Sequence, residues 1–315
     1  MLHFILKLLS SCISRNKLVI LNFHQVLENN DVLRPGEPNK EKFDWQMALL
    51  KTYYKPMSIS YALNLLGQGK LPTNSVCITF DDGYLNNYTV ALPLLKKHNI
   101  PATVFVASAF SHGENMWNDR IIDLFASFKG EEIDLSAAGL GKVVIKEHEI
   151  KYQTAWQTVL ALKYFPINDR LSKVKQLYQD NGNIHETRKM MLPEEILAMS
   201  EAGIEIASHT HNHPIIKDLT EKELLAEILT NKNLLEQWTG KAVTGFAYPN
   251  GKTGIDFNEK AFNVLATLGI KYAVTTQWGF STPTSEQYTL KRFTPWDDKP
   301  WKFHLRMLLN LIRNK

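Results

Sequence analysis

The stretch VCITFDDGY, residues 76–84, joins a continuous apolar run to two adjacent carboxylates and a glycine. The run 76–80 predicts a buried strand, and Asp-Asp-Gly predicts the turn that ends it. Seven more short β-rich runs occur, at 18–23, 56–60, 102–107, 204–208, 243–247, 272–276 and 289–293. Helical patterns lie between them, as in 40–53, 86–98, 193–202, 220–238 and 257–268. This alternation is typical of parallel βα units.

Eight strands with intervening helices predict an α/β fold with a closed or nearly closed (β/α) barrel. An open doubly wound sheet is the alternative. The segment 111–190 breaks the rhythm, and we expect it to form a helical insertion, a lid or a substrate wall. The expected organisation is an apolar helix at 1–16, the barrel with its insertion at 17–296, and a basic amphipathic helix at 297–315.

The charge balance and the two ends of the chain bear on partners and location. The chain has 36 Lys and Arg against 32 Asp and Glu, a net charge of +4 that is too mild to predict a nucleic-acid partner. The apolar run 1–13 is too short to span a bilayer, and it lacks the flanks of a signal peptide. We therefore expect a cytoplasmic protein. Its terminal helices either pack on the domain or make peripheral contact with the inner face of the membrane.

Asp81 and Asp82 follow the buried strand directly. In a βα barrel this end of a strand faces the active site. Adjacent residues there point in different directions, so one carboxylate can bind a metal while the other holds or deprotonates water. A plain turn that caps the next helix is the structural alternative.

Three histidines alternate after the strand 204–208, in Ser208-His209-Thr210-His211-Asn212-His213. His209 and His213 are four residues apart, so a tight loop can bring both imidazoles to one side. Two histidines and a carboxylate suit zinc, while cobalt, nickel and iron tolerate the same ligands. Asp82, His209 and His213 would leave metal positions open, as catalysis requires.

The motifs TFDDGY and SHTHNH together resemble the first two motifs of the polysaccharide deacetylases, the NodB-like carbohydrate esterase family 4. The resemblance covers roughly 18–295, without 111–190. It implies a distorted (β/α) barrel and metal-dependent removal of N-acetyl groups from amino sugars. By position, Asp81 is then the catalytic base, and Asp82, His209 and His213 are the ligands of one divalent ion, with zinc preferred. His211 does not match a ligand position.

The stretch FAYPNG, 246–251, resembles the family's third motif but departs from it at Ala247, where many members have an arginine that orients the catalytic Asp. We expect Arg292, at the end of the last predicted strand, to supply that charge. The resemblance places the backbone N–H of Asn250 in the oxyanion hole. Tyr248 and Pro249 are then expected in the substrate wall, with a plain turn as the alternative.

The general acid has no clear match to the family pattern. His24 ends the first predicted strand and points to the same face of the barrel, so it is the main candidate. His304, within the C-terminal helix, is the second. Indole rings stack on sugars, so Trp117, Trp278 and Trp296 are candidate cleft walls, although each could serve packing alone.

These observations predict a hydrolase that acts on an N-acylated amino sugar of a polysaccharide or of a glycan precursor. Because position 247 is an alanine where many family members have an arginine, a second class of protein stays open. This is a non-catalytic glycan-binding or scaffold protein with the same fold. Hydrolysis of another carbon–nitrogen bond, such as a formamide, would use the same chemistry.

Overall fold

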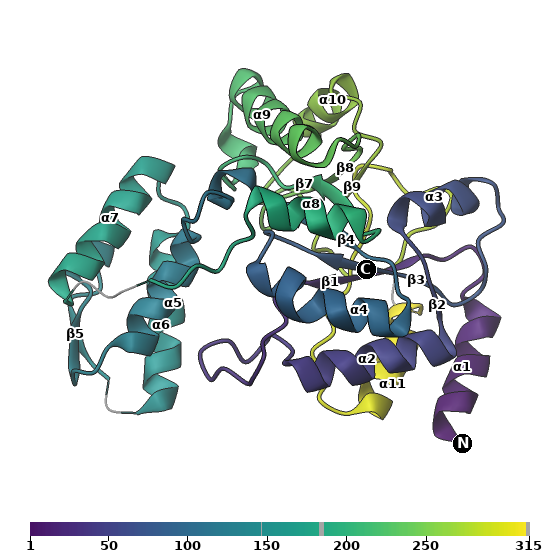
Figure 1. The fold of residues 1–315 in the computed structure, drawn as a ribbon, viewed down its shortest axis with the longest axis horizontal. Coiled ribbons are helices and arrows are strands. Elements are labelled where there is room, and N and C mark those ends of the chain that lie inside the picture. The colour runs from purple at the N-terminus through teal and green to yellow at the C-terminus, as the bar shows by residue number, and fades with distance from the viewer. Residues whose placement is uncertain (146, 183–185, 313–315) are drawn as a thin grey trace. The chain divides into compact units, whose positions relative to one another are not determined.

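The computed structural model describes residues 1–145, 147–182 and 186–312. The chain forms two units: Met1–Asn29, Gly36–His112 and Met191–Lys315 make unit 1, and Asn30–Pro35 with Gly113–Met190 makes unit 2. Unit 1 carries a parallel sheet (Figure 1). Its neighbouring strands are, in order, β1 (Val19–Phe23), β3 (Ser75–Phe80), β4 (Thr103–Val106), β7 (Glu205–Ser208), β8 (Gly245–Ala247) and β9 (Tyr272–Val274), and β2 (Lys55–Pro56) pairs with the start of β3.

The eighth predicted strand, 289–293, is present only as two parallel bridges, and these bridges join the two edges of the sheet. Leu290 pairs with Val274 of β9, and Phe293 pairs with Leu21 of β1. The segment passes from one partner to the other within a few residues, so it has no room for a regular ladder. The predicted distorted barrel is confirmed, and the open doubly wound alternative is wrong.

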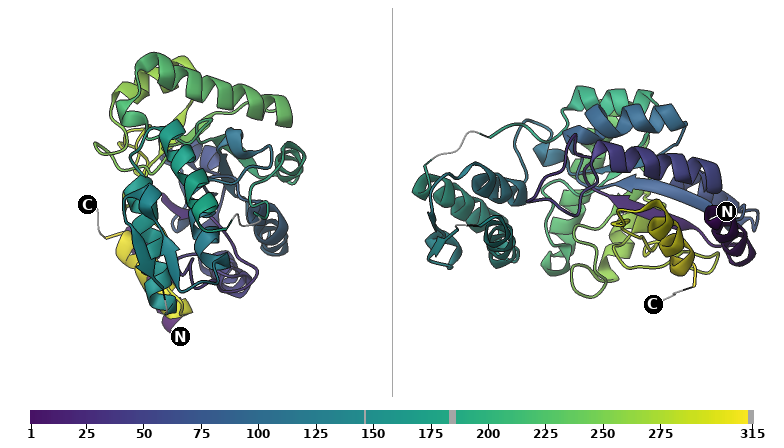
Figure 2. Two further views of the ribbon diagram at one scale, coloured as in Figure 1. Left: turned by 90° about the vertical axis from the view of Figure 1, so that its left-hand side faces the viewer. Right: turned by 90° about the horizontal axis from the view of Figure 1, so that it is seen from below.

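Helices surround the sheet of unit 1 (Figures 1 and 2). Local sequence explains where several of these helices begin. Asn39 caps the second helix of the chain and Ser58 caps the third. Pro193 occupies the first turn of α8, and Thr220 forms a capping box at the start of α9. The helices are α1 (Leu2–Ile13), α2 (Lys40–Tyr53), α3 (Ile59–Gly67), α4 (Leu92–His98), α8 (Pro193–Glu201), α9 (Glu221–Thr239), α10 (Lys260–Thr267) and α11 (Pro300–Asn310).

Alternation along the strands divides the core into two layers. Outward-facing residues of the sheet pack with α2, α4 and α11 in one cluster, which includes Leu21, Phe80 and Phe303. Inward-facing residues such as Ile20, Cys77 and Phe105 form a second cluster. Nearer the carboxyl ends of the strands, the inward positions become polar, and these are Asn22, Thr79, Asp81 and Arg292. The barrel therefore ends in a buried polar layer.

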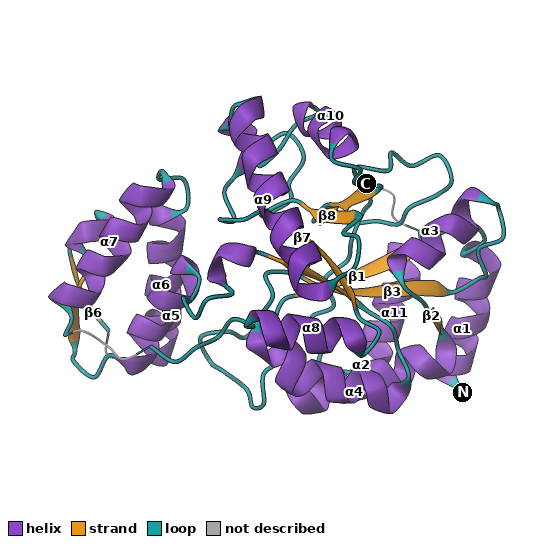
Figure 3. Cartoon of the chain, turned by 45° about the horizontal axis from the view of Figure 1, so that its top comes forward, coloured by secondary structure: helices purple, strands orange, loops and turns teal. Residues whose placement is uncertain are grey.

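Unit 2 has its own core and is mainly helical (Figure 3). Its elements are α5 (Trp117–Ser127), α6 (His148–Leu162), α7 (Ile167–Asp180) and the antiparallel pair β5 (Glu132–Asp134) and β6 (Lys142–Val144). The sequence predicted an insertion at 111–190, and the structure adds the distant segment Asn30–Pro35 to the same unit.

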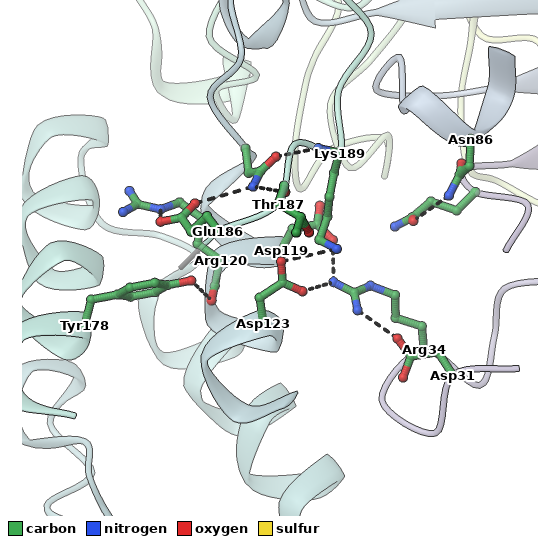
Figure 4. Close-up of polar contacts among 12 residues, drawn as sticks. Asp31, Arg34, Asn86, Asp119, Arg120, Asp123, Tyr178, Glu186, Thr187 and Lys189 are labelled. Atoms are coloured by element: carbon green, nitrogen blue, oxygen red, sulfur yellow. Dashed lines mark hydrogen bonds and ion pairs between the residues drawn. The ribbon is translucent and has the colours of Figure 1, made fainter. Parts of the chain in front are cut away.

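An ion-pair cluster explains why that distant segment belongs to unit 2 (Figure 4). The buried Arg34 guanidinium contacts Asp31 at 2.8 Å, Asp119 at 3.0 Å and Asp123 at 2.9 Å. Lys189 lies 3.2 Å from Asp123 and adds a second positive charge. Buried arginine needs such partners, so the cluster ties the segment to α5.

In the described part of the chain, each helix is too short or too polar to cross a bilayer.

Candidate functional site

Asp82, His209 and His213 form a cluster at the carboxyl ends of β3 and β7. One ligand atom from each lies within 4.8 Å of the others. Asp82 Oδ1 lies 3.3 Å from His209 Nε2 and 3.4 Å from His213 Nε2. Two neutral imidazole nitrogens and one carboxylate oxygen match the ligand preferences of zinc and similar divalent ions. The predicted ligands therefore lie together.

The backbone around these ligands adopts strained conformations that set the direction of their side chains. Asp82 has φ 76°, Thr210 has φ 64° and His213 has φ 52°, in the left-handed region that L-residues seldom occupy. Asn250, at the end of β8, has φ 60°. Such conformations persist where the surrounding structure holds them, and they concentrate at functional sites.

Two hydrogen-bonding features prepare the cluster for a cation. His209 Nδ1 lies 2.8 Å from the carbonyl oxygen of Ala247, so it donates there and the ring turns Nε2 toward Asp82. Burial alone would raise the pKa of Asp82, but the His209 hydrogen bond and the charges of His213 and His24 hold it well below its usual range. Asp82 is therefore an ionised ligand at neutral pH.

Asp81 lies beside the cluster and is held by Arg292, both almost fully buried. Arg292 Nη1 donates to Asp81 Oδ1 at 2.6 Å, and Nη2 donates to Oδ2 at 2.7 Å. Arg292 is itself fixed by Asn22 Oδ1 at 2.8 Å and by the carbonyl of Thr275 at 2.9 Å. Burial raises the pKa of Asp81, but the Arg292 charge, followed by His209, outweighs it and lowers the pKa overall. The carboxylate is thus ionised and fixed in direction.

His24 follows β1, and the charges of Asp81 and Asp82 act on its imidazole. Burial lowers its pKa, while the charges of Asp82, Glu37 and Asp81 raise it by more, so the net change is upward. This is the direction that a proton donor near neutral pH requires. A divalent ion on Asp82 would cancel part of that attraction and leave the contributions of Glu37 and Asp81.

Comparison with known proteins agrees with this geometry. A sequence profile described as polysaccharide deacetylase matches residues 68–273, which is more than half of the chain. The chain belongs to the polysaccharide deacetylase family. A chain of this family is a hydrolase that acts on carbon–nitrogen bonds.

Individual relatives of this deacetylase-family chain are distant. A poly-β-1,6-N-acetyl-D-glucosamine N-deacetylase of Staphylococcus aureus is 24% identical over 90% of this chain and 80% of its own length. The Streptococcus pyogenes deacetylase PplD, solved with acetate, matches 93% of this chain and 98% of its own with a TM-score of 0.61 at 19% identity. IcaB from Ammonifex degensii matches 95% and 98% with a TM-score of 0.61 at 18% identity. The two structures establish the shared fold.

In the third motif of the family, the prediction that Tyr248 and Pro249 line the substrate wall is wrong. Tyr248 is fully buried, with its ring stacked 3.6 Å from that of Phe257, and Pro249 is buried beside it. Both pack in the core and present no surface to a sugar. Asn250 is partly exposed at the end of β8, and Gly251 follows it with φ 74°.

The tryptophan predictions divide in a similar way. Trp117 is buried in the core of unit 2, and the Arg170 guanidinium lies 4.5 Å from its ring, so it has no free face for a sugar. The prediction for Trp117 is therefore wrong. Trp278 and Trp296 of unit 1 are 38% and 40% exposed, with ring centroids 4.6 Å apart. They remain candidates for stacking on a sugar.

His304 is wrong as a candidate general acid. It lies buried on α11 among the rings of His3, Tyr53 and Tyr54, and it contacts α1 instead of the metal cluster. Burial and the neighbouring His3 lower its pKa to about 4. His24 is the remaining candidate.

Sequence reasoning missed the residues that hold the histidine loop. Glu227 of α9 accepts the backbone N–H groups of His211 at 3.0 Å and Asn212 at 2.8 Å. The His211 ring points to Ser108 Oγ at 2.9 Å, away from the ligand cluster. Asn231 donates to the same hydroxyl at 2.8 Å. A glutamate and an asparagine on an amphipathic helix resemble ordinary surface residues, so the sequence offers no signal for this role.

Proposed function

We propose that this chain is a metal-dependent deacetylase that removes N-acetyl groups from amino-sugar residues of a polysaccharide or of a glycan precursor. The observation that carries the proposal is the Asp82, His209 and His213 cluster beside an ionised Asp81 that Arg292 clamps. A site built for binding alone has no need of a fixed carboxylate base next to a cation site.

The donor set fits a divalent ion, with zinc preferred and cobalt, nickel or iron as alternatives. Asp82, His209 and His213 would hold it. When bound, the ion supplies Lewis acidity toward the amide carbonyl and lowers the pKa of water. The remaining chemistry belongs to side chains and backbone of the barrel.

Asp81 is the proposed base, since its carboxylate is ionised and can accept a proton from the attacking water. Arg292 keeps that carboxylate in one orientation with two charge-assisted hydrogen bonds. His24 is the proposed donor of a proton to the leaving amine. The backbone N–H of Asn250 is the proposed partner of the developing oxyanion.

Arg292 also removes the main argument for a non-catalytic glycan-binding protein. That argument rested on Ala247, which lacks the arginine usual at its position. Arg292 reaches Asp81 from the segment that closes the barrel, so the charge is supplied from another part of the chain.

Acetate release from oligomers of β-1,6-linked N-acetylglucosamine is the first test, because a relative is named for that polymer. Chitin oligomers and N-formyl and O-acetyl analogues distinguish the sugar linkage and the acyl group. We expect Asp81→Asn to lower turnover by about 10²–10⁴-fold while the ion stays bound. We expect His24→Gln to lower turnover far more than metal affinity. Absence of acetate release by the ion-loaded protein on every substrate contradicts the proposal.

A further inference from the structure

Helix α1 is amphipathic, but its polar side faces the domain and its apolar side faces solvent. Its polar side packs on the domain: Ser10 Oγ donates to Asn74 Oδ1 at 2.7 Å, Ser14 Oγ donates to the same oxygen at 3.1 Å, and Asn74 Nδ2 donates to Ser11 Oγ at 2.6 Å. Asn74, which accepts and donates these bonds, is 5% exposed. Contacts of this kind fix which side of the helix faces outward.

The outward side of α1 is entirely apolar. With 3.6 residues per turn, positions 1, 2, 4, 5, 8, 9 and 12 share one face. Its large side chains are exposed to solvent, and these are Met1 at 102%, Leu2 at 49%, Phe4 at 59%, Ile5 at 44%, Leu8 at 51% and Leu9 at 51%. Cys12 is exposed on the same face. A contiguous exposed apolar surface of this kind marks an interaction site.

Helix α11 extends this surface. It packs against α1, as the right-hand view in Figure 2 shows, and His3 Nδ1 lies 3.0 Å from His304 Nδ1 between them. Trp301 and Leu309 of α11 are 43% and 39% exposed, and Ile312, just beyond the end of the helix, is 63% exposed.

The two segments that form this surface are basic in sequence, although one of their cations, Arg306, is paired with Asp297 at 2.6 Å. Residues 1–17 and 299–315 contain no Asp or Glu, and they contain eight Lys and Arg. These eight belong to the 36 basic residues of the chain, so the remainder has 28 basic against 32 acidic residues and is net negative. The net positive charge of the chain thus comes from its two terminal segments.

We propose that α1 and α11 form a docking surface for an anionic lipid bilayer, with the apolar face of α1 inserted at the headgroup boundary. Exposed Leu, Ile, Phe and Trp flanked by basic residues are the features of helices that lie in that interface. The twelve residues of α1 are too few to cross the hydrocarbon core, so the helix lies on the surface. Asn74 precedes β3, so α1 lies at the amino ends of the strands, whereas the metal cluster lies at their carboxyl ends.

Vesicle co-sedimentation of the full chain tests the proposal. The vesicles contain either equal parts of phosphatidylglycerol and phosphatidylcholine or phosphatidylcholine alone. We expect binding to the anionic vesicles that weakens with salt, and a loss of more than about tenfold for Phe4→Gln/Leu8→Gln/Leu9→Gln. The matched control is Tyr61→Gln/Leu229→Gln, which removes two exposed apolar side chains from α3 and α9 and should bind like the wild type. Thermal unfolding of each variant checks its fold.

A fluorophore on Cys12 gives a second measurement that needs no disruptive variant. Cys77 is buried and its thiol pKa is raised, so an environment-sensitive thiol reagent labels Cys12. We expect a blue shift on addition of anionic vesicles, and none for the same dye on Cys12→Ser/Tyr61→Cys.

Two results overturn the proposal. One is a wild-type protein that stays in the supernatant, with unchanged dye emission. The other is a dimer in light scattering that becomes monomeric in the α1 triple variant without any vesicle binding, which would assign the face to a second copy of the chain.

Discussion

Replacing Arg292 tests how the barrel prepares its base. The guanidinium makes two hydrogen bonds of 2.6 and 2.7 Å to Asp81, and both residues are almost fully buried. Arg292→Ala leaves the carboxylate without its main counter-charge. Since burial is the largest influence on Asp81 and acts to raise its pKa, we expect that pKa to rise in the variant.

The structure sets the size of the effect. A hydrogen bond to a charged group contributes about 1.5–3 kcal/mol. Two such bonds to the base correspond to about 3–6 kcal/mol, or roughly 10²–10⁴ in turnover if both act on the reacting carboxylate. Arg292→Lys keeps the charge but loses the two-pronged geometry, so its turnover should lie between those of Arg292→Ala and the wild type.

The assay is steady-state acetate release across pH, with metal content measured in parallel. Because Asp81 must be ionised, a raised pKa moves the acidic limb of kcat/KM to higher pH. Metal content should stay at the wild-type level, since Arg292 contacts the base and not the ligands. Arg34→Ala is the matched control, because it removes another buried arginine, from unit 2, and should lower thermal stability without moving the pH profile.

A further variant asks whether the position of the arginine matters. Adding Ala247→Arg to Arg292→Ala places an arginine where many family members have one, and we expect partial recovery of turnover. Two results would contradict this role of Arg292. One is an Arg292→Ala variant that keeps the turnover of the wild type, and the other is a variant that loses bound metal and turnover to the same degree.

Three other predictions follow from single contacts. Glu227→Gln should weaken metal binding by about tenfold in a calorimetric titration, because the histidine loop loses a carboxylate anchor, whereas the exposed Glu221→Gln on the same helix should not. Gly251→Ala should lower the free energy of unfolding by more than about 1 kcal/mol, because its Cβ would lie 2.9 Å from a backbone nitrogen at φ 74°, and an unchanged melting temperature would contradict this. His304 has a pKa of about 4 against 6.5 unfolded, so the unfolded chain binds its proton first and stability falls as pH drops through that window. Thermal melts of His304→Phe should show a weaker pH dependence than the wild type there, and identical slopes would refute the burial of a neutral imidazole.

Local patterns were sufficient to predict the barrel and the metal cluster. Asp82 and His209 each follow a short buried strand, and parallel strands bring their carboxyl ends to one edge. Arg292 was also predictable, because the last strand of a closed barrel must neighbour the first. The pairing of Phe293 with Leu21 is the contact that brings it there.

Other features depend on contacts that no local pattern encodes. Tyr248 lies in a turn motif, yet its ring packs against Phe257, which comes from another segment. Trp117 is buried because unit 2 has a core of its own. The segment Asn30–Pro35 joins that unit through Arg34, an ion-pair partner that is distant in sequence.

The central claim is that Asp82, His209 and His213 hold one divalent ion that the deacetylation requires. Its most direct test is acetate release by chelator-treated protein titrated with zinc or cobalt, beside His209→Ala. We expect wild-type activity to rise until one ion per chain is bound, and His209→Ala to gain no activity at the same metal concentration. Full activity of the metal-free protein, or an equal response of the variant, would contradict it.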